Sequence, residues 1–143
     1  MNVVTLAGAE MNLSFEEREL LRRGLLEWGG PADCTEKMAV AIGFRDVADL
    51  LSEGHRIADD LLAGRSLTTS DWRRALLVTE VVFVSDVLGS GIDWSITTGL
   101  KDDETLRMLR SVQRKLAASH SGKTGVLATT STPVLYEPIT YVM

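Results

Sequence analysis

The sequence predicts an all-α protein, a single compact bundle of about five helices around a buried central helix (about 71–88), with an extended C-terminal arm. First, residues 72–88 (WRRALLVTEVVFVSDVL) are apolar on every side at about 100° per residue, and such a helix is normally buried all round. Second, the flanking segments carry apolar residues at helical spacing, with start and stop signals. Third, 143 residues with 45% apolar and 24% charged residues have the size and composition of one globular domain.

The chain divides into three parts by this interpretation. Residues 1–12 are expected to form an N-terminal arm or short strand, and residues 13–120 the helical domain. Within the domain, Ser14 followed three residues later by Glu17 is a capping-box signature. It predicts a first helix over about 15–28, which a Gly-Gly-Pro sequence ends.

Two further helices precede the central one. Thr35 can cap a short helix that ends at Gly43, and a longer helix is expected over about 45–62. Gly54 lies in the apolar stripe of the longer helix, where glycine costs about 1 kcal/mol of helix propensity, so we expect it to permit a close helix crossing. An acidic ridge follows the neighbouring face of this helix and consists of Asp46, Asp49, Glu53 and Asp60.

The central helix has Thr69 or Ser70 as its expected N-cap, and a Gly-Ser-Gly sequence follows it. A polar loop then leads to a last helix, which begins at Asp102 or Asp103 and ends near Ser119. The apolar positions of this helix are expected to face inward: Leu106, Leu109, Val112 and Leu116. Three arginines fall within about 60° of each other on its outer side and form an arginine stripe: Arg107, Arg110 and Arg114.

Residues 121–143 are expected to form the extended C-terminal arm, because two prolines and a row of β-branched and aromatic residues disfavour a helix. The arm is too apolar for a purely solvated linker. Its candidate partner-binding residues are Val134, Leu135, Tyr136 and Tyr141. An apolar extended segment can add a strand to a sheet edge or lie in a groove of a neighbouring chain, and it can equally fold back across its own bundle.

Composition and motifs argue against several function classes. A formal net charge of -5 makes nonspecific nucleic-acid binding unlikely, because such binding neutralises phosphates. One cysteine, Cys34, permits no intrachain disulfide and no cysteine zinc site, and two histidines without a ligand motif predict no metal and no cofactor. The SGKTG sequence at 121–125 is not a phosphate loop, because the position that requires glycine is Ala117. No apolar run is long enough for a membrane span or a signal peptide, which favours the cytoplasm.

Two carboxylates, Glu80 and Asp86, interrupt the apolar surface of the central helix. Each needs a partner, because an unpaired buried carboxylate costs several kcal/mol. They point about 120° apart, so they do not form a catalytic pair within the helix. The favoured interpretation is structural: Glu80 bonds an arginine such as Arg73, and Asp86 accepts hydrogen bonds from the following loop. The functional alternative makes either one a ligand contact or a general base.

The loop 89–103 is the candidate ligand site, where Asp93 and Trp94 join Glu80 and Asp86 to form a polar pocket with an aromatic wall. The favoured alternative is that Trp94 fills the core while the loop's hydroxyl groups cap helix ends.

The function predicted from these patterns is that of a small intracellular protein–protein interaction or assembly protein, which binds a protein partner or a copy of itself through its C-terminal arm and charged helix faces. The acidic ridge and the arginine stripe are complementary and can pair within one molecule, between two copies, or not at all. The alternative is an enzyme or small-ligand-binding protein with its site at the end of the central helix. A nucleic-acid-binding regulator that uses the arginine stripe is a weaker third hypothesis.

Overall fold

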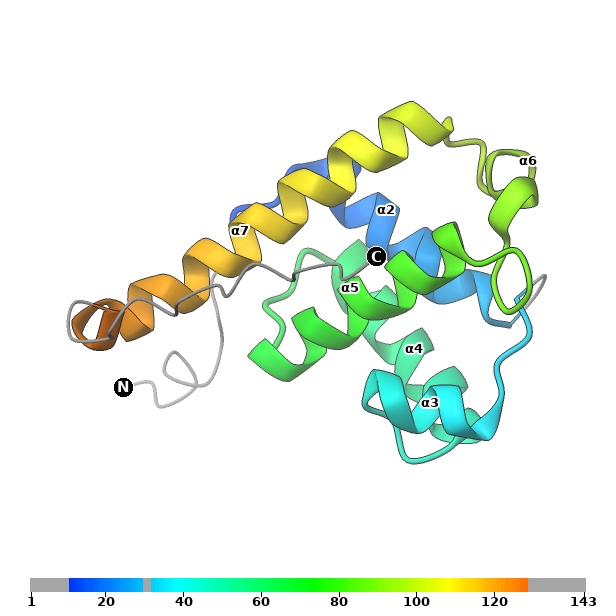
Figure 1. The fold of residues 1–143 in the computed structure, drawn as a ribbon, viewed down its shortest axis with the longest axis horizontal. Coiled ribbons are helices and arrows are strands. Elements are labelled where there is room, and N and C mark those ends of the chain that lie inside the picture. The colour runs from blue at the N-terminus through cyan, green and yellow to red at the C-terminus, as the bar shows by residue number, and fades with distance from the viewer. Residues whose placement is uncertain (1–10, 30–31, 129–143) are drawn as a thin grey trace, which may run out of the picture.

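The computed structural model describes residues 11–29 and 32–128, and side chains as far as Ser119. The described part is all-α, as predicted, with no strand. Figure 1 shows its elements: α2 (Phe15–Glu27), α3 (Glu36–Ile42), α4 (Val47–Leu62), α5 (Thr69–Val84), the 3-10 helix η1 (Gly91–Asp93), α6 (Trp94–Thr98) and α7 (Asp102–Ala128). Among the described helices, none combines the length and the hydrophobicity that a membrane span requires.

Local capping signals place the helix starts. Ser14 and Glu17 form the predicted capping box at the start of α2, and Thr35 caps α3 through the backbone N–H of Met38. The N-cap of α5 is Thr68, one residue before the predicted candidates, because its hydroxyl accepts a hydrogen bond from the backbone of Asp71. These caps satisfy N–H groups that the first helical turn leaves without partners.

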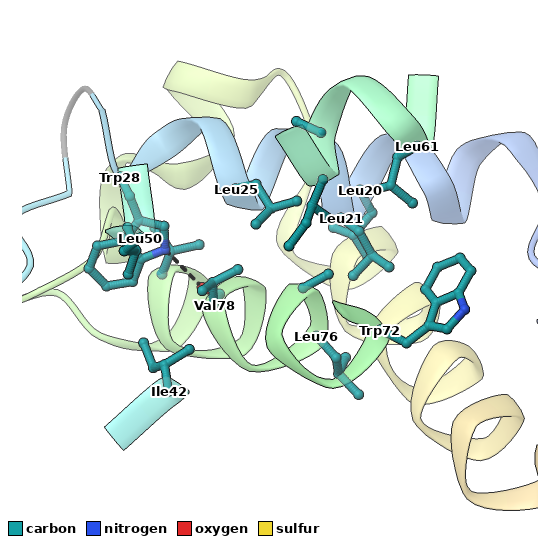
Figure 2. Close-up of a cluster of buried hydrophobic side chains, with 14 of the residues drawn as sticks. Leu20, Leu21, Leu25, Trp28, Ile42, Leu50, Leu61, Trp72, Leu76 and Val78 are labelled. Carbon is teal, nitrogen blue, oxygen red and sulfur yellow. Dashed lines mark hydrogen bonds between the residues drawn. The ribbon is translucent and has the colours of Figure 1, made fainter. Parts of the chain in front are cut away.

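Helix α5 is central, since it contacts α2, α3, α4, α7 and η1. Figure 2 shows its buried side against α2, where the indole N–H of Trp28 donates to the carbonyl oxygen of Val78 at 3.2 Å. Two details differ from the prediction. The helix ends at Val84 rather than near residue 88, and its outer side is open, with Leu77 39% and Val84 75% exposed. The neighbouring elements leave one stripe of α5 uncovered, so its all-round apolarity does not produce all-round burial.

A glycine allows α2 and α5 to cross closely, but it is Gly24 rather than the predicted Gly54. A Cβ atom at Gly24 would lie 2.2 Å from the Oγ1 atom of Thr79, which is fully buried on α5. A Cβ atom at Gly54 would meet only the flexible end of Leu25, at 3.9 Å. The close approach therefore depends on the missing side chain of Gly24.

Helix α7 differs from the prediction in length and in its buried side. It continues to Ala128, so the part 121–128 of the predicted arm is helical, because no proline interrupts the chain there and propagation of an existing helix adds a hydrogen bond per residue. Thr105 is buried in place of Leu106, which is 50% exposed, while Leu109 and Val112 are buried as predicted. The predictions for residues 1–10 and for the arm residues Val134, Leu135, Tyr136 and Tyr141 lie outside the described residues.

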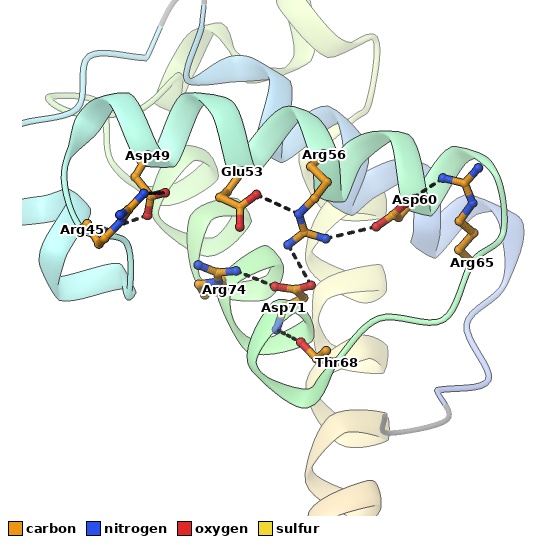
Figure 3. A network of polar contacts seen from close by, with 9 residues as sticks. All are labelled: Arg45, Asp49, Glu53, Arg56, Asp60, Arg65, Thr68, Asp71 and Arg74. Carbon is orange, nitrogen blue, oxygen red and sulfur yellow. Dashed lines mark hydrogen bonds and ion pairs between the residues drawn. The ribbon is translucent and has the colours of Figure 1, made fainter. Parts of the chain in front are cut away.

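The acidic ridge of α4 pairs with nearby arginines (Figure 3), so it does not depend on the arginine stripe of α7. Arg56 contacts Glu53, Asp60 and Asp71 at 2.8, 3.1 and 3.0 Å, and the buried Asp71 also accepts a hydrogen bond from Arg74. Burial alone would raise the pKa of Asp71, but the hydrogen bonds from Arg74 and Arg56 outweigh burial and lower it. The network therefore links α4 to the first turn of α5, and Asp49, Glu53 and Asp60 of the ridge are each paired with an arginine.

Candidate functional site

The chain makes a closely packed turn where α5 ends. The backbone N–H of Ser90 donates to the carbonyl oxygen of Val82 at 2.8 Å, so the chain folds back beneath the last turn of the helix. Gly89 makes this possible, because a Cβ atom there would lie 2.5 Å from the Val82 oxygen. Gly91 has a φ of +42°, and a Cβ atom on it would lie 2.5 Å from the Cα atom of Asp86. Both positions require glycine, and the turn is closely packed as a result.

Trp94 anchors the following helix α6 to the domain. Its side chain is fully buried, and its indole N–H donates to the hydroxyl oxygen of Thr105 at 2.9 Å. The ring of Phe83 meets it edge to face, with 5.7 Å between the ring centroids. The hydroxyl group of Thr98 donates to the carbonyl oxygen of Trp94. Trp94 therefore fills the core, as the favoured interpretation predicted, but no side-chain hydrogen bond caps the start of η1 or α6, where hydroxyl caps were expected.

Four large aliphatic side chains between residues 84 and 96 project into solvent. Their exposed fractions are 75% for Val84, 88% for Val87, 78% for Ile92 and 79% for Ile96. We call these four residues the α5–α6 corner. Burying one such side chain contributes about 1.5–3 kcal/mol, so displaying four of them within thirteen residues forgoes considerable stability. Large exposed apolar side chains gathered on one short segment favour a protein-binding role.

The four predicted ligand-binding residues differ in burial and in their hydrogen-bond partners. Asp86 accepts a hydrogen bond from the backbone N–H of Ile92 at 3.1 Å, as the structural interpretation predicted. Glu80 accepts a hydrogen bond from the side-chain amide of Gln113 on α7. The prediction that Glu80 pairs with an arginine such as Arg73 is therefore wrong. Asp86 and Asp93 are exposed, whereas Trp94 has no exposed surface with which to line a pocket. The helical spacing used for Asp86 fails because α5 ends two residues before it.

The arginine stripe remains exposed on α7. Arg107 lies 3.9 Å from Asp103, and Arg110 donates to the side-chain oxygen of Gln113 at 2.9 Å. Arg114 is also exposed. A partner-binding role for these arginines stays a prediction.

A groove of about 580 Å³ lies between α2 and α7. Phe15, Leu100 and Met108 contribute most of its apolar wall, and the buried Glu17 lies beside them. Burial alone would raise the pKa of Glu17, but its hydrogen bonds with Lys115, Ser111 and the backbone of Ser14 lower it to about 2. Lys115 Nζ lies 2.6 Å from the carboxylate. Glu17 therefore acts as an ionised link between α2 and α7.

This link predicts an acid sensitivity that depends on Glu17. A carboxyl group whose pKa falls from 4.5 to about 2 on folding stabilises the fold fully above pH 4.5, and that contribution disappears as the pH falls toward 2. We expect wild type to lose about 2 kcal/mol more stability than Glu17→Gln between pH 5 and pH 2, with allowance for the partly exposed Lys115. Denaturant unfolding across this pH range measures the difference.

The matched control is Glu16→Gln, on the exposed neighbouring residue, which should retain the pH dependence of wild type. If Glu17→Gln instead follows the wild-type curve as the pH falls, the carboxylate is not the link described here.

No group of three or more histidine, cysteine, aspartate or glutamate side chains in residues 11–29 and 32–128 is arranged to hold a metal ion. The sequence pointed to this region, but the candidate binding residues were the polar ones and Trp94 rather than the aliphatic ones. The aliphatic residues were missed because residues 72–88 were treated as one buried helix. One signal was present: Ile92 and Ile96 flank Trp94 at a spacing that turns both away from it in a helix.

Comparison of the chain with known protein families, with curated proteins and with solved structures finds no match in any of the three.

Proposed function

We propose that this chain is a protein-binding protein that docks a partner on the α5–α6 corner. The observation that supports this proposal is the exposure of Val84, Val87, Ile92 and Ile96 on a segment that close-packed glycines and a buried tryptophan attach to the domain. An apolar surface that is already positioned before binding loses less conformational entropy on binding, which favours affinity.

The surroundings of the corner indicate the partner's chemistry. Asp86 and Asp93 are exposed within the same segment, so two carboxylates accompany its exposed aliphatic side chains. Charge complementarity across an interface raises the association rate and excludes wrong partners. A complementary partner therefore presents an apolar surface with basic side chains at its edge. The arginine stripe of α7 and residues 129–143 are proposed as additional contact surfaces.

Site-specific photo-crosslinking in cells that produce the full chain tests this proposal. A photoreactive amino acid at position 92 is expected to give one dominant crosslinked product, either with another protein or with a second copy of the chain. The same amino acid at position 52, an exposed serine on α4, is the matched control. Equal and diffuse labelling from positions 92 and 52 would count against a docking role for the corner.

The alternative of an enzyme or small-ligand-binding protein at the end of α5 required a cavity that contains both Asp86 and Trp94. Trp94 is packed between Phe83 and Thr105 instead, with no exposed surface. The protein-binding proposal accounts better for the exposed aliphatic residues of the same segment.

A further inference from the structure

A second apolar groove, of about 520 Å³, lies between α5 and α7. Leu76, Leu116 and Ala117 form its apolar part, and Arg73 and Gln113 are its polar lining residues. Glu80 accepts a hydrogen bond from Gln113, so the amide is already engaged. Arg73 is exposed and is the charged residue of the lining. The groove therefore suits an apolar segment that carries one negative charge.

Helix α7 continues well beyond this groove. Among the side chains that the structure describes, which end at Ser119, Leu116 is the last one of α7 in the core, and the helix runs twelve residues further, to Ala128, which is about 18 Å at the helical rise. Figure 1 shows this half of α7 projecting beyond the other helices. It contains Gly122 and Gly125, which each cost about 1 kcal/mol in a helix, and isolated helices of this length are marginal in water. A packing partner is needed to stabilise it.

The sequence that follows α7 matches the α5–α7 groove in chemistry. Residues 129–143 read TTSTPVLYEPITYVM, with seven apolar or aromatic residues after Pro133 and a single charged residue, Glu137. An apolar segment with one carboxylate is the complement of an apolar groove with one arginine at its edge. Fifteen residues reach up to about 50 Å when extended, which is ample for the groove.

We propose that residues 133–143 occupy the α5–α7 groove of a second copy of this chain, with Glu137 next to the partner copy's Arg73. If the projecting halves of two α7 helices pack antiparallel and cross near residue 122, Ala128 of one copy lies beside Ala117 of the other. The segment then enters the groove of the second copy without reversing direction. Within one chain it would first have to reverse and return about 18 Å. The exchange is mutual, so it closes as a two-fold dimer.

This inference rests on the binding role proposed for residues 129–143 and not on the α5–α6 corner. It also accounts for the projecting half of α7, because each copy covers the other's helix.

Disulfide trapping in the full chain, with Cys34→Ser as background, tests the exchange. One chain carries Ala117→Cys and a second, mass-tagged chain carries Leu135→Cys, and the two are produced together and mildly oxidised. We expect a disulfide between the two different chains at a yield at least tenfold above a control in which Ser52→Cys replaces Ala117→Cys. A single chain with both Ala117→Cys and Leu135→Cys should give covalent dimers.

Two results would overturn the inference: an internal disulfide in a monomer of the doubly substituted chain, which means that the segment lies in its own groove, or a yield no higher than the Ser52→Cys control. The charge pairing is tested separately. Arg73→Glu should lower the disulfide yield, and adding Glu137→Arg should restore it, with circular dichroism confirming that both variants are folded. Ile92→Asp should leave the yield unchanged, which separates this inference from the role of the corner.

Discussion

Replacing Gly24 with alanine is expected to lower the free energy of unfolding by about 2–3 kcal/mol, although alanine is the better helix former. The new Cβ atom would lie 2.2, 2.8 and 2.8 Å from the Oγ1, Cβ and Cγ2 atoms of Thr79. Thr79 cannot easily move aside, because it is fully buried and its hydroxyl group donates to the Ala75 carbonyl oxygen at 2.8 Å. Helices α2 and α5 must therefore separate. Urea denaturation measures the loss.

Gly54→Ala is the matched control, since it makes the same change in a neighbouring helix where the nearest side-chain atom is 3.9 Å away. It should be neutral or stabilising by up to about 1 kcal/mol. Thr79→Ala removes two of the three clashing atoms, so the double variant Gly24→Ala/Thr79→Ala should be more stable than the sum of the single changes predicts. Strict additivity, or equal effects at Gly24 and Gly54, would contradict the close crossing.

Trp94→Ala is expected to destabilise the protein by about 3–5 kcal/mol, the range for removing a large buried aromatic side chain. The substitution opens a cavity beside Phe83 and removes the donor to Thr105. Trp94→Phe keeps most of the ring volume and should cost about 1–2 kcal/mol, mainly for the lost hydrogen bond and the smaller ring. Equilibrium denaturation ranks these variants.

Ile96→Ala is the control for Trp94, because it lies two residues further along α6 and is 79% exposed. Its effect should stay within about 0.5 kcal/mol, as is usual for surface positions. If Ile96→Ala instead lowered the free energy of unfolding strongly and Trp94→Ala lowered it little, α6 would face the domain with its other side. Ile96 would then be buried and could not belong to the exposed α5–α6 corner.

The sequence was sufficient for features that depend on neighbouring residues. The capping box of Ser14 and Glu17 and the cap at Thr35 follow from spacings of three residues, and both are present. The all-α class follows from helical periodicity along the chain. Asp86 accepts a hydrogen bond from the following loop, as expected for a carboxylate near a helix end.

Features that depend on how helices meet were not predictable in this way. Both Gly24 and Gly54 lie within helices, and only the crossing of α2 with α5 distinguishes them. Helix α5 ends at Val84 and Gly89 then packs against Val82, a contact between turns that no local propensity reveals. The last helix is a further example. Thr105 is buried and accepts a hydrogen bond from the indole N–H of Trp94, while the more apolar Leu106 is exposed.

These differences also explain why the segment after α5 presents exposed aliphatic side chains instead of the predicted polar pocket. Val84 and Val87 were expected to be buried with the rest of the central helix, and the polar residues Asp86 and Asp93 were the candidates for binding a ligand. The early end of α5 turns Val84 and Val87 to solvent, and the burial of Trp94 leaves Ile92 and Ile96 outside. The exposed aliphatic surface, rather than the carboxylates, now carries the functional proposal.

The central claim is that the α5–α6 corner binds a protein partner, and the most direct measurement is the affinity of the protein crosslinked from position 92. Isothermal titration should show that Ile92→Asp weakens binding by at least about thirtyfold, the effect of losing about 2 kcal/mol at an interface hot spot. The free energy of unfolding should change little, because Ile92 is 78% exposed. Unchanged affinity in a folded Ile92→Asp variant would contradict the claim.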